Sequence, residues 1–135
     1  MPLRASFAGM KPWILAIAAA LGLSGVALGA FGAHGLKGVL NQAQLATFDT
    51  AVRYQLYHAL VLVGVSLIPT GMAQRSWAAR LLVAGVLLFS GSLYLYLAGG
   101  PRWLVYVTPA GGLCLMLGWL LLLLTALRLH RRPQA

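Results

Sequence analysis

Hydrophobic and polar positions divide this chain into four long apolar stretches, separated by short segments that hold the charges. No Asp, Glu, Lys or Arg occurs at positions 12–36, 54–74, 81–101 or 103–127, which are runs of 25, 21, 21 and 25 residues. A helix needs about 20 apolar residues to cross a hydrocarbon core of about 30 Å. The pattern therefore predicts an all-α integral membrane four-helix bundle, with residues 1–135 forming a single four-span domain.

The segment before the second run is amphipathic. Polar residues alternate with apolar ones between positions 40 and 52, and Leu45, Phe48, Val52 and Leu56 recur at helical spacing. No Pro interrupts positions 45–68, and Gly64 is the only glycine among them. We expect a short amphipathic outer segment between the first two helices, running directly into the second span.

Turn and cap residues predict where the spans begin and end. The Pro and Gly at 69–71 should end the second helix, and Ser76 should cap the third. The sequence AGGP at 98–101 predicts a tight turn. Thr108 and Pro109 are expected to start the fourth helix, because a first-turn proline gives up an amide hydrogen that the helix does not use there.

Composition and charge exclude a soluble protein. Hydrophobic residues make up 61% of the chain and charged residues only 8%, whereas soluble chains carry roughly 25% charged residues. The net charge of +9 would suggest nucleic acid as the partner of a soluble chain. Here the basic residues lie at the ends of apolar runs, where they act as topology signals, so no nucleic-acid partner is expected.

The distribution of basic residues predicts the orientation in the membrane. Seven of the ten Lys and Arg residues lie on the side shared by both termini, against three on the other. Because basic loops stay in the cytoplasm, both termini are expected to be cytoplasmic. The basic start followed by an apolar stretch also resembles a secretory signal, but the full-length span favours an uncleaved anchor that forms the first helix.

The first span carries glycines at three- and four-residue spacing. Small residues on one face let two helices approach closely in lipid, where no hydrophobic force drives them together. This face is expected to be the central packing seam, either within the chain or between two copies of it. The seam residues are Gly22, Gly25, Gly29 and Gly32.

Polar side chains in or beside the spans are the candidate binding residues, because lipid makes each of them costly unless it finds a partner. They gather in the predicted outer half, while the inner half is almost entirely aliphatic. Asp49 and Arg53 are four residues apart on a helix and are expected to pair. The full set is His34, Asp49, Arg53, Tyr54, Gln55, His58, Ser90, Ser92, Tyr94 and Thr108. Six of these are expected to converge near the outer surface: His34, Tyr54, His58, Ser90, Ser92 and Thr108.

The residues favour no cofactor, metal or catalytic site. A zinc site needs three or four ligands, and only Asp49 could join His34 and His58. Catalytic motifs are missing, and a single acid cannot supply both halves of acid–base chemistry. Two alternatives stay open: a redox, metal or haem subunit that uses the two histidines, and a transporter component that works as an oligomer.

Several motifs together resemble one family. They are GAFGAHGL at 29–36, FDTAVRYQ at 48–55 with HAL at 58–60, FSGSLY at 89–94, TPAGGL at 108–113, and GW at 118–119. In this order they resemble the uncharacterised YgdD-type inner-membrane family, which also includes the animal transmembrane protein 256. The resemblance implies four spans, an inner (plasma) membrane location and no established activity.

Taken together, these features predict a non-catalytic membrane protein with an outer-half polar cluster. The cluster would bind a membrane lipid or another small ligand, dock a membrane protein or a second copy of the chain, or only hold the bundle together.

Overall fold

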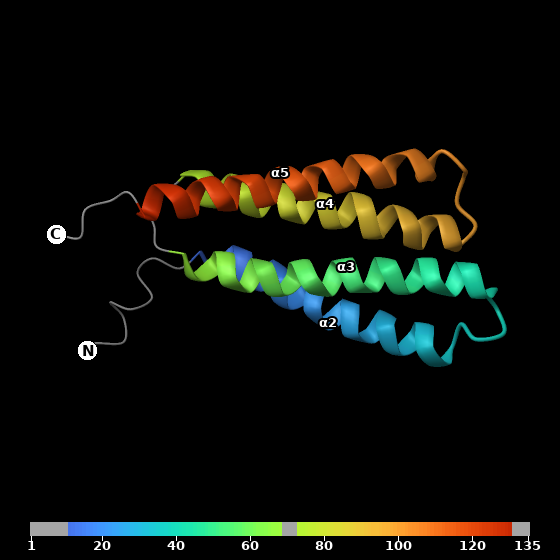
Figure 1. Ribbon diagram of the computed structural model, residues 1–135. Coiled ribbons are helices and arrows are strands. Elements are labelled where there is room, and N and C mark those ends of the chain that lie inside the picture. Colours follow the sequence, from blue (N-terminus) through green and yellow to red (C-terminus); the bar gives the residue numbers. More distant parts are fainter. Residues whose placement is uncertain (1–10, 69–72, 131–135) are drawn as a thin grey trace, which may run out of the picture.

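The computed structural model describes residues 11–68 and 73–130, and these fold into four long antiparallel helices (Figure 1). The helices are α2 (Pro12–His34), α3 (Gln42–Leu67), α4 (Ala73–Leu97) and α5 (Leu104–His130). The predicted all-α four-helix bundle is confirmed. We call the end where α2 begins and α5 ends the terminal end, and the opposite end the loop end.

Three of the described helices, α2, α4 and α5, are long and apolar enough to cross a membrane. The fourth, α3, is less apolar because its first half is the amphipathic segment. As predicted, that segment continues without a break into the second apolar run. Asn41 caps α3 and exchanges hydrogen bonds with Gln44, which satisfies amide groups that the first turn leaves free.

Two of the predicted helix starts are wrong. Thr108 and Pro109 lie inside α5, which begins at Leu104 directly after the turn at 98–101. Ser76 lies inside α4 and accepts a hydrogen bond from Lys11 Nζ. Both errors arose because a residue that favours caps also serves in a membrane helix as a side-chain hydrogen-bonding group. The predicted stop at Pro69 and Gly71 lies outside the described residues, and α3 ends just before it.

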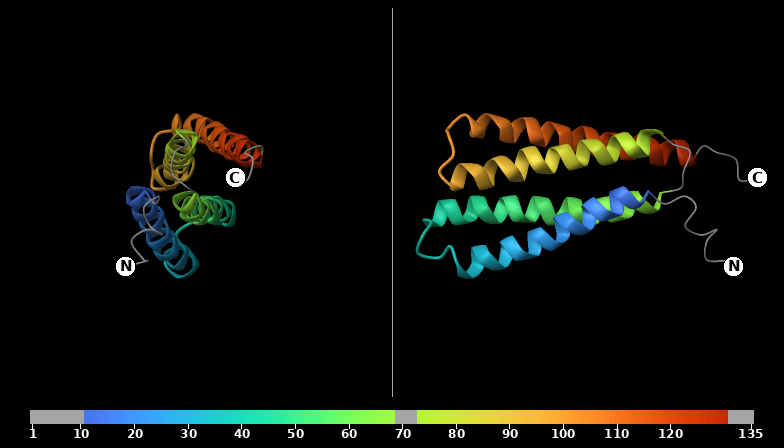
Figure 2. Two further views of the ribbon diagram at one scale, coloured as in Figure 1. Left: turned by 90° about the vertical axis from the view of Figure 1, so that its left-hand side faces the viewer. Right: turned by 180° about the vertical axis from the view of Figure 1, so that it is seen from behind.

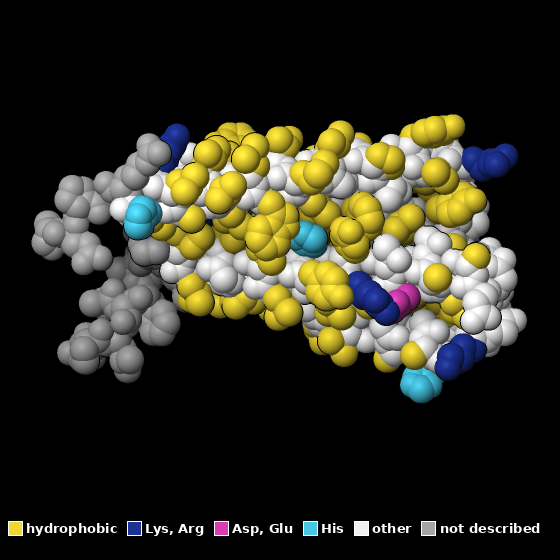
Figure 3. Space-filling model, viewed as in Figure 1, with side chains coloured by type: hydrophobic (Ala, Val, Ile, Leu, Met, Phe, Trp, Pro, Cys, Tyr) yellow, Lys and Arg dark blue, Asp and Glu magenta, His cyan; other side chains and the backbone are white. Residues whose placement is uncertain are grey.

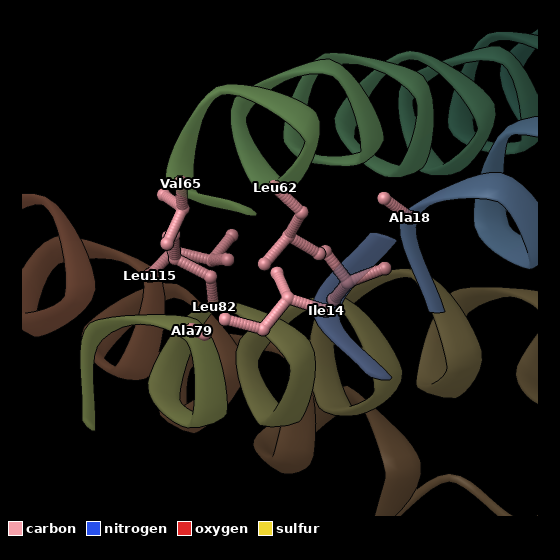
Figure 4. Packing of buried hydrophobic residues seen from close by; sticks show 8 residues of the cluster. Ile14, Ala18, Leu62, Val65, Ala79, Leu82 and Leu115 are labelled. Carbon is pink, nitrogen blue, oxygen red and sulfur yellow. The ribbon is translucent and has the colours of Figure 1, made fainter. Parts of the chain in front are cut away.

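The helices form two hairpins, α2–α3 and α4–α5, which pack together mainly through α3 and α4 (Figure 2). Near the terminal end, all four helices contribute to one aliphatic core (Figure 4). Its buried residues are Ile14, Ala18, Leu62, Val65, Ala79, Leu82, Val86 and Leu115.

The glycine face of α2 packs against α3 in the same chain. A Cβ added at Gly25 would lie 2.7 Å from Leu56 Cδ2, and one at Gly29 would lie 3.3 Å from Val52 Cγ1. Gly32 packs as closely against the Phe48 ring. Gly22 has no such neighbour within 4 Å, so it does not take part in the α2–α3 contact.

The closest backbone approach is between α4 and α5, not along α2. A Cβ at Gly111 would lie 2.8 Å from the Leu88 carbonyl carbon and from Phe89 Cα. In the same interface, Gly85 packs closely against Leu115 and Gly118 packs closely against Leu82. Backbone contact leaves no room for a side chain, so the main small-residue seam belongs to the second hairpin.

Candidate functional site

The buried polar side chains form several small bridges between neighbouring helices. Gln55 of α3 is at the centre of the largest and is only 4% exposed. Its Nε2 donates to Leu21 O at 2.9 Å and to Ser24 Oγ at 2.8 Å, both on α2. Its Oε1 accepts from the Tyr94 hydroxyl of α4 at 2.9 Å. One amide side chain therefore joins three helices.

The serines of α4 make separate bridges. Ser90 Oγ donates to the Ala51 carbonyl oxygen of α3 at 2.7 Å. The Ser92 and Thr108 hydroxyls lie 2.7 Å apart and link α4 to α5. Each bridge satisfies polar atoms that would otherwise be buried in lipid without a partner.

His58 links α3 to α5 through both ring nitrogens. Its Nδ1 lies 2.7 Å from the Tyr54 carbonyl oxygen, and Trp119 Nε1 donates to its Nε2 at 3.2 Å. A carbonyl only accepts hydrogen bonds and an indole N–H only donates them. The ring is therefore neutral, with its proton on Nδ1 and its Nε2 lone pair directed at Trp119.

A groove of about 870 Å³ lies beside this bond and opens on the side of the bundle between α3 and α5. Figure 3 shows hydrophobic side chains along this face, with a histidine among them. The Tyr54 and Phe89 rings stack within the wall, with centroids 4.3 Å apart. The lining residues are Tyr54, Tyr57, His58, Phe89, Pro109, Gly112, Leu113, Leu115, Met116 and Trp119.

The groove lies deeper than the sequence predicted for its histidine. At 1.5 Å per residue, His58 is about 24 Å along α3 and Trp119 is about 22 Å along α5, measured from the loop end. These helices have 26 and 27 residues, so the bond lies near mid-length. His58 lies this far from the loop end because α3 begins twelve residues before the charge-free run that was taken as the span.

The structure does not bring the ten candidate residues into one cluster. His34 is exposed at the loop end of α2, away from the buried bridges. Asp49 and Arg53 form the predicted pair, with Arg53 Nη2 2.8 Å from Asp49 Oδ2, but their side chains are 56% and 63% exposed. Within residues 11–68 and 73–130, no three His, Cys, Asp or Glu side chains are grouped as a metal site would require.

Sequence reasoning missed several residues that shape these sites. Ser24 was overlooked as a partner of Gln55. Trp119 was noted only as part of a motif, although a tryptophan in the middle of a span cannot be an interfacial anchor. The position of Trp119 inside the charge-free run 103–127 could therefore have identified it as a candidate site residue. Arg75 is buried near the terminal end and donates a hydrogen bond to the Ile68 carbonyl oxygen. Its positive charge stabilises the C-terminal end of α3, where the helix dipole is negative.

Comparison with known proteins gives consistent matches. The family described as "Protein of unknown function (DUF423)" matches residues 28–112. The UPF0382 membrane protein of Staphylococcus haemolyticus (strain JCSC1435) is 40% identical over 120 residues, covering 88% of this chain and 98% of that one. The UPF0382 inner membrane protein YgdD of Escherichia coli (strain K12) is 37% identical over 125 residues, covering 89% and 93%. No solved structure matches.

Proposed function

This chain belongs to the DUF423 family of membrane proteins of unknown function, and from that premise we propose that it binds a small membrane-dissolved molecule in the α3–α5 groove. The observation that carries the proposal is the groove itself. Its volume of about 870 Å³ lies within the range of roughly 300–1,000 Å³ typical of small-molecule sites. Its opening on the side of the bundle gives a molecule dissolved in the bilayer direct access.

The chemistry of the lining also supports binding. Six of the ten lining residues are apolar side chains or glycine, and the other four, two tyrosines, a histidine and Trp119, carry the polar groups. Ligand sites commonly combine such apolar walls with a few polar groups that fix the orientation of the ligand. The groove therefore suits a largely apolar molecule with one small polar group.

The arrangement favours binding over catalysis. Ser90 is hydrogen-bonded to the Ala51 carbonyl oxygen, and Ser92 to the Thr108 hydroxyl. Neither of these partners is a general base that could activate a serine as a nucleophile. Both nitrogens of His58 are engaged by Tyr54 and Trp119. We therefore assign the groove a carrier, sensor or assembly role in which the ligand is not chemically changed.

Filling the groove should release its ligand. Only Phe89 Cδ2, at 3.9 Å, lies near a Cβ added at Gly112, so Gly112→Leu should place its side chain in the groove without disturbing the helices. We expect a molecule that co-purifies with the unchanged protein in mild detergent to be lost from this variant. Native mass spectrometry, followed by analysis of the organic extract, measures the loss.

Gly22→Leu is the matched control for that experiment. It makes the same change on α2, where nothing lies within 4 Å of the added Cβ. This variant should keep the ligand. If both variants retain the same bound mass, or if the occupant proves to be another protein, the small-molecule proposal is wrong.

We also propose that the terminal end faces the cytoplasm. Lys11 and Arg128 flank the bundle at this end, and seven of the ten basic residues belong to the same side. Alkaline phosphatase fused after Arg132 should be inactive, because the enzyme needs export to fold. An active fusion would reverse the orientation, while a fusion in the 98–101 turn should show the opposite activity.

A further inference from the structure

We infer that the ligand of the α3–α5 groove is a neutral apolar molecule with a hydroxyl group, which inserts between Trp119 and His58. The inference rests on the proposed binding function and specifies its ligand class. Three observations carry it: the depth of the Trp119–His58 bond, its donor and acceptor arrangement, and the aromatic wall beside it.

The position of the bond within the charge-free runs argues against recognition of a phospholipid headgroup. His58 and Trp119 lie about 22–24 Å from the loop ends of helices that are about 40 Å long. His58 belongs to the charge-free run 54–74 and Trp119 to the interior of the run 103–127, and His58 lies five residues, about 7 Å, beyond the exposed Arg53, so the bond lies below the charged layer of α3. Phospholipid headgroups stay at the interface, and an acyl chain carries no hydrogen-bonding group at this depth. A molecule that uses these nitrogens must bring its polar atom into the bilayer interior.

The charge of the lining excludes an ionic ligand. None of the ten residues that line the groove is Asp, Glu, Lys or Arg. The Arg53 guanidinium is paired with Asp49 on the exposed face of α3. A buried charge without a counter-ion in hydrocarbon is strongly unfavourable, so the ligand is neutral.

The hydrogen-bond arrangement selects a hydroxyl. Trp119 Nε1 is a donor, and His58 Nε2 is an acceptor because the His58 proton is held on Nδ1 by the Tyr54 carbonyl. A ligand hydroxyl can accept from the indole and donate to the imidazole, which replaces the direct bond without leaving either group unsatisfied. A ketone or ether could accept from Trp119 but would leave Nε2 without a donor.

The side chains leave room for this insertion. Trp119 is 50% exposed, so its ring can move outward while His58, which is 6% exposed, stays fixed by Tyr54. The two nitrogens, now 3.2 Å apart, would separate to about 5 Å to admit one oxygen. The stacked Tyr54 and Phe89 rings beside them favour a flat ring on the ligand. A phenol with an apolar tail meets all these requirements.

A matched pair of probes tests the inference. 4-Nonylphenol and its methyl ether, 4-nonylanisole, differ only in that a methyl group replaces the hydroxyl proton of the phenol in the ether. Each is titrated into the protein in phosphatidylcholine nanodiscs, with Trp13, Trp77 and Trp103 replaced by Phe so that fluorescence reports on Trp119 alone. We expect the phenol to bind at least about tenfold more tightly than the ether, because the ether leaves His58 Nε2 unsatisfied.

Titration of both probes into a His58→Phe variant tests whether His58 recognises the hydroxyl. The variant keeps a ring at the position but removes the acceptor, so the advantage of the phenol over the ether should disappear. The comparison of the two probes in protein with His58 intact does not depend on this variant folding. Gly112→Leu should block both probes, and Gly22→Leu should block neither.

The outcomes separate the inference from the proposed function. Equal binding of phenol and ether would overturn the hydroxyl inference while leaving the groove as a binding site. If the phenol still binds more tightly than the ether in the His58→Phe variant, the hydroxyl is recognised by another group, and the inference is also overturned. Failure of both probes to bind overturns the ligand class, whereas the proposed function is judged by whether Gly112→Leu loses its co-purifying molecule.

Discussion

Replacing Gly111 with alanine is expected to destabilise the α4–α5 hairpin by about 1–3 kcal/mol or more. The added methyl carbon would lie 2.8 Å from the Leu88 carbonyl carbon and from Phe89 Cα. Both are backbone atoms and cannot rotate away as a side chain does. The helices must therefore separate, which also weakens the nearby Ser92–Thr108 hydrogen bond. Thermal unfolding in mild detergent, followed by size-exclusion chromatography, measures the loss.

The neighbouring glycine provides the control for this prediction. At Gly112 the only atom within 4 Å of an added Cβ is Phe89 Cδ2, at 3.9 Å, which is an ordinary contact. Gly112→Ala makes the identical change one residue along and should unfold at the temperature of the unchanged protein or slightly above it, because alanine favours helix. Equal unfolding temperatures for the two variants would show that α4 and α5 do not meet as described.

Gly25→Leu is expected to have the second large effect, by separating α2 from α3. A Cβ at this position would already lie 2.7 Å from Leu56 Cδ2 and 3.4 Å from Gln55 Nε2. A full leucine would displace the Gln55 amide and weaken its bonds to Leu21 and Ser24. Overpacking costs about 1–3 kcal/mol, and each interhelical hydrogen bond lost in a membrane adds about 0.6 kcal/mol.

The same substitution one turn earlier on α2 is the matched control. Gly22→Leu adds an equal side chain where no atom of another helix lies within 4 Å, so it should leave the unfolding temperature unchanged. The two variants share helix, residue type and hydrophobicity, and therefore differ only in contact with α3. An unfolding temperature for Gly25→Leu that matches the control would contradict the α2–α3 seam.

The sequence alone determined the features that depend on residues close together in the chain. The charge-free runs specified four helices, because the bilayer thickness sets the apolar length that each span needs. The unbroken helical spacing from Leu45 onward showed that the amphipathic segment belongs to α3, and the i,i+4 spacing predicted the Asp49–Arg53 pair. The turn at 98–101 also followed from residues adjacent in the chain, and Gly99 has the positive φ of 94° that favours glycine.

The tertiary structure decided which residues meet. Helical periodicity assigns a residue to a face, but it does not specify which helix covers that face or how far the two helices slide along each other. That register depends on contacts such as Gly111 against Phe89, which lie more than twenty residues apart. It placed Trp119 against His58 near mid-length, left Gly22 without a close neighbour on α3 and left His34 outside the polar bridges. The groove between α3 and α5 exists only because the two hairpins pack mainly through α3 and α4, a long-range arrangement that no local pattern encodes.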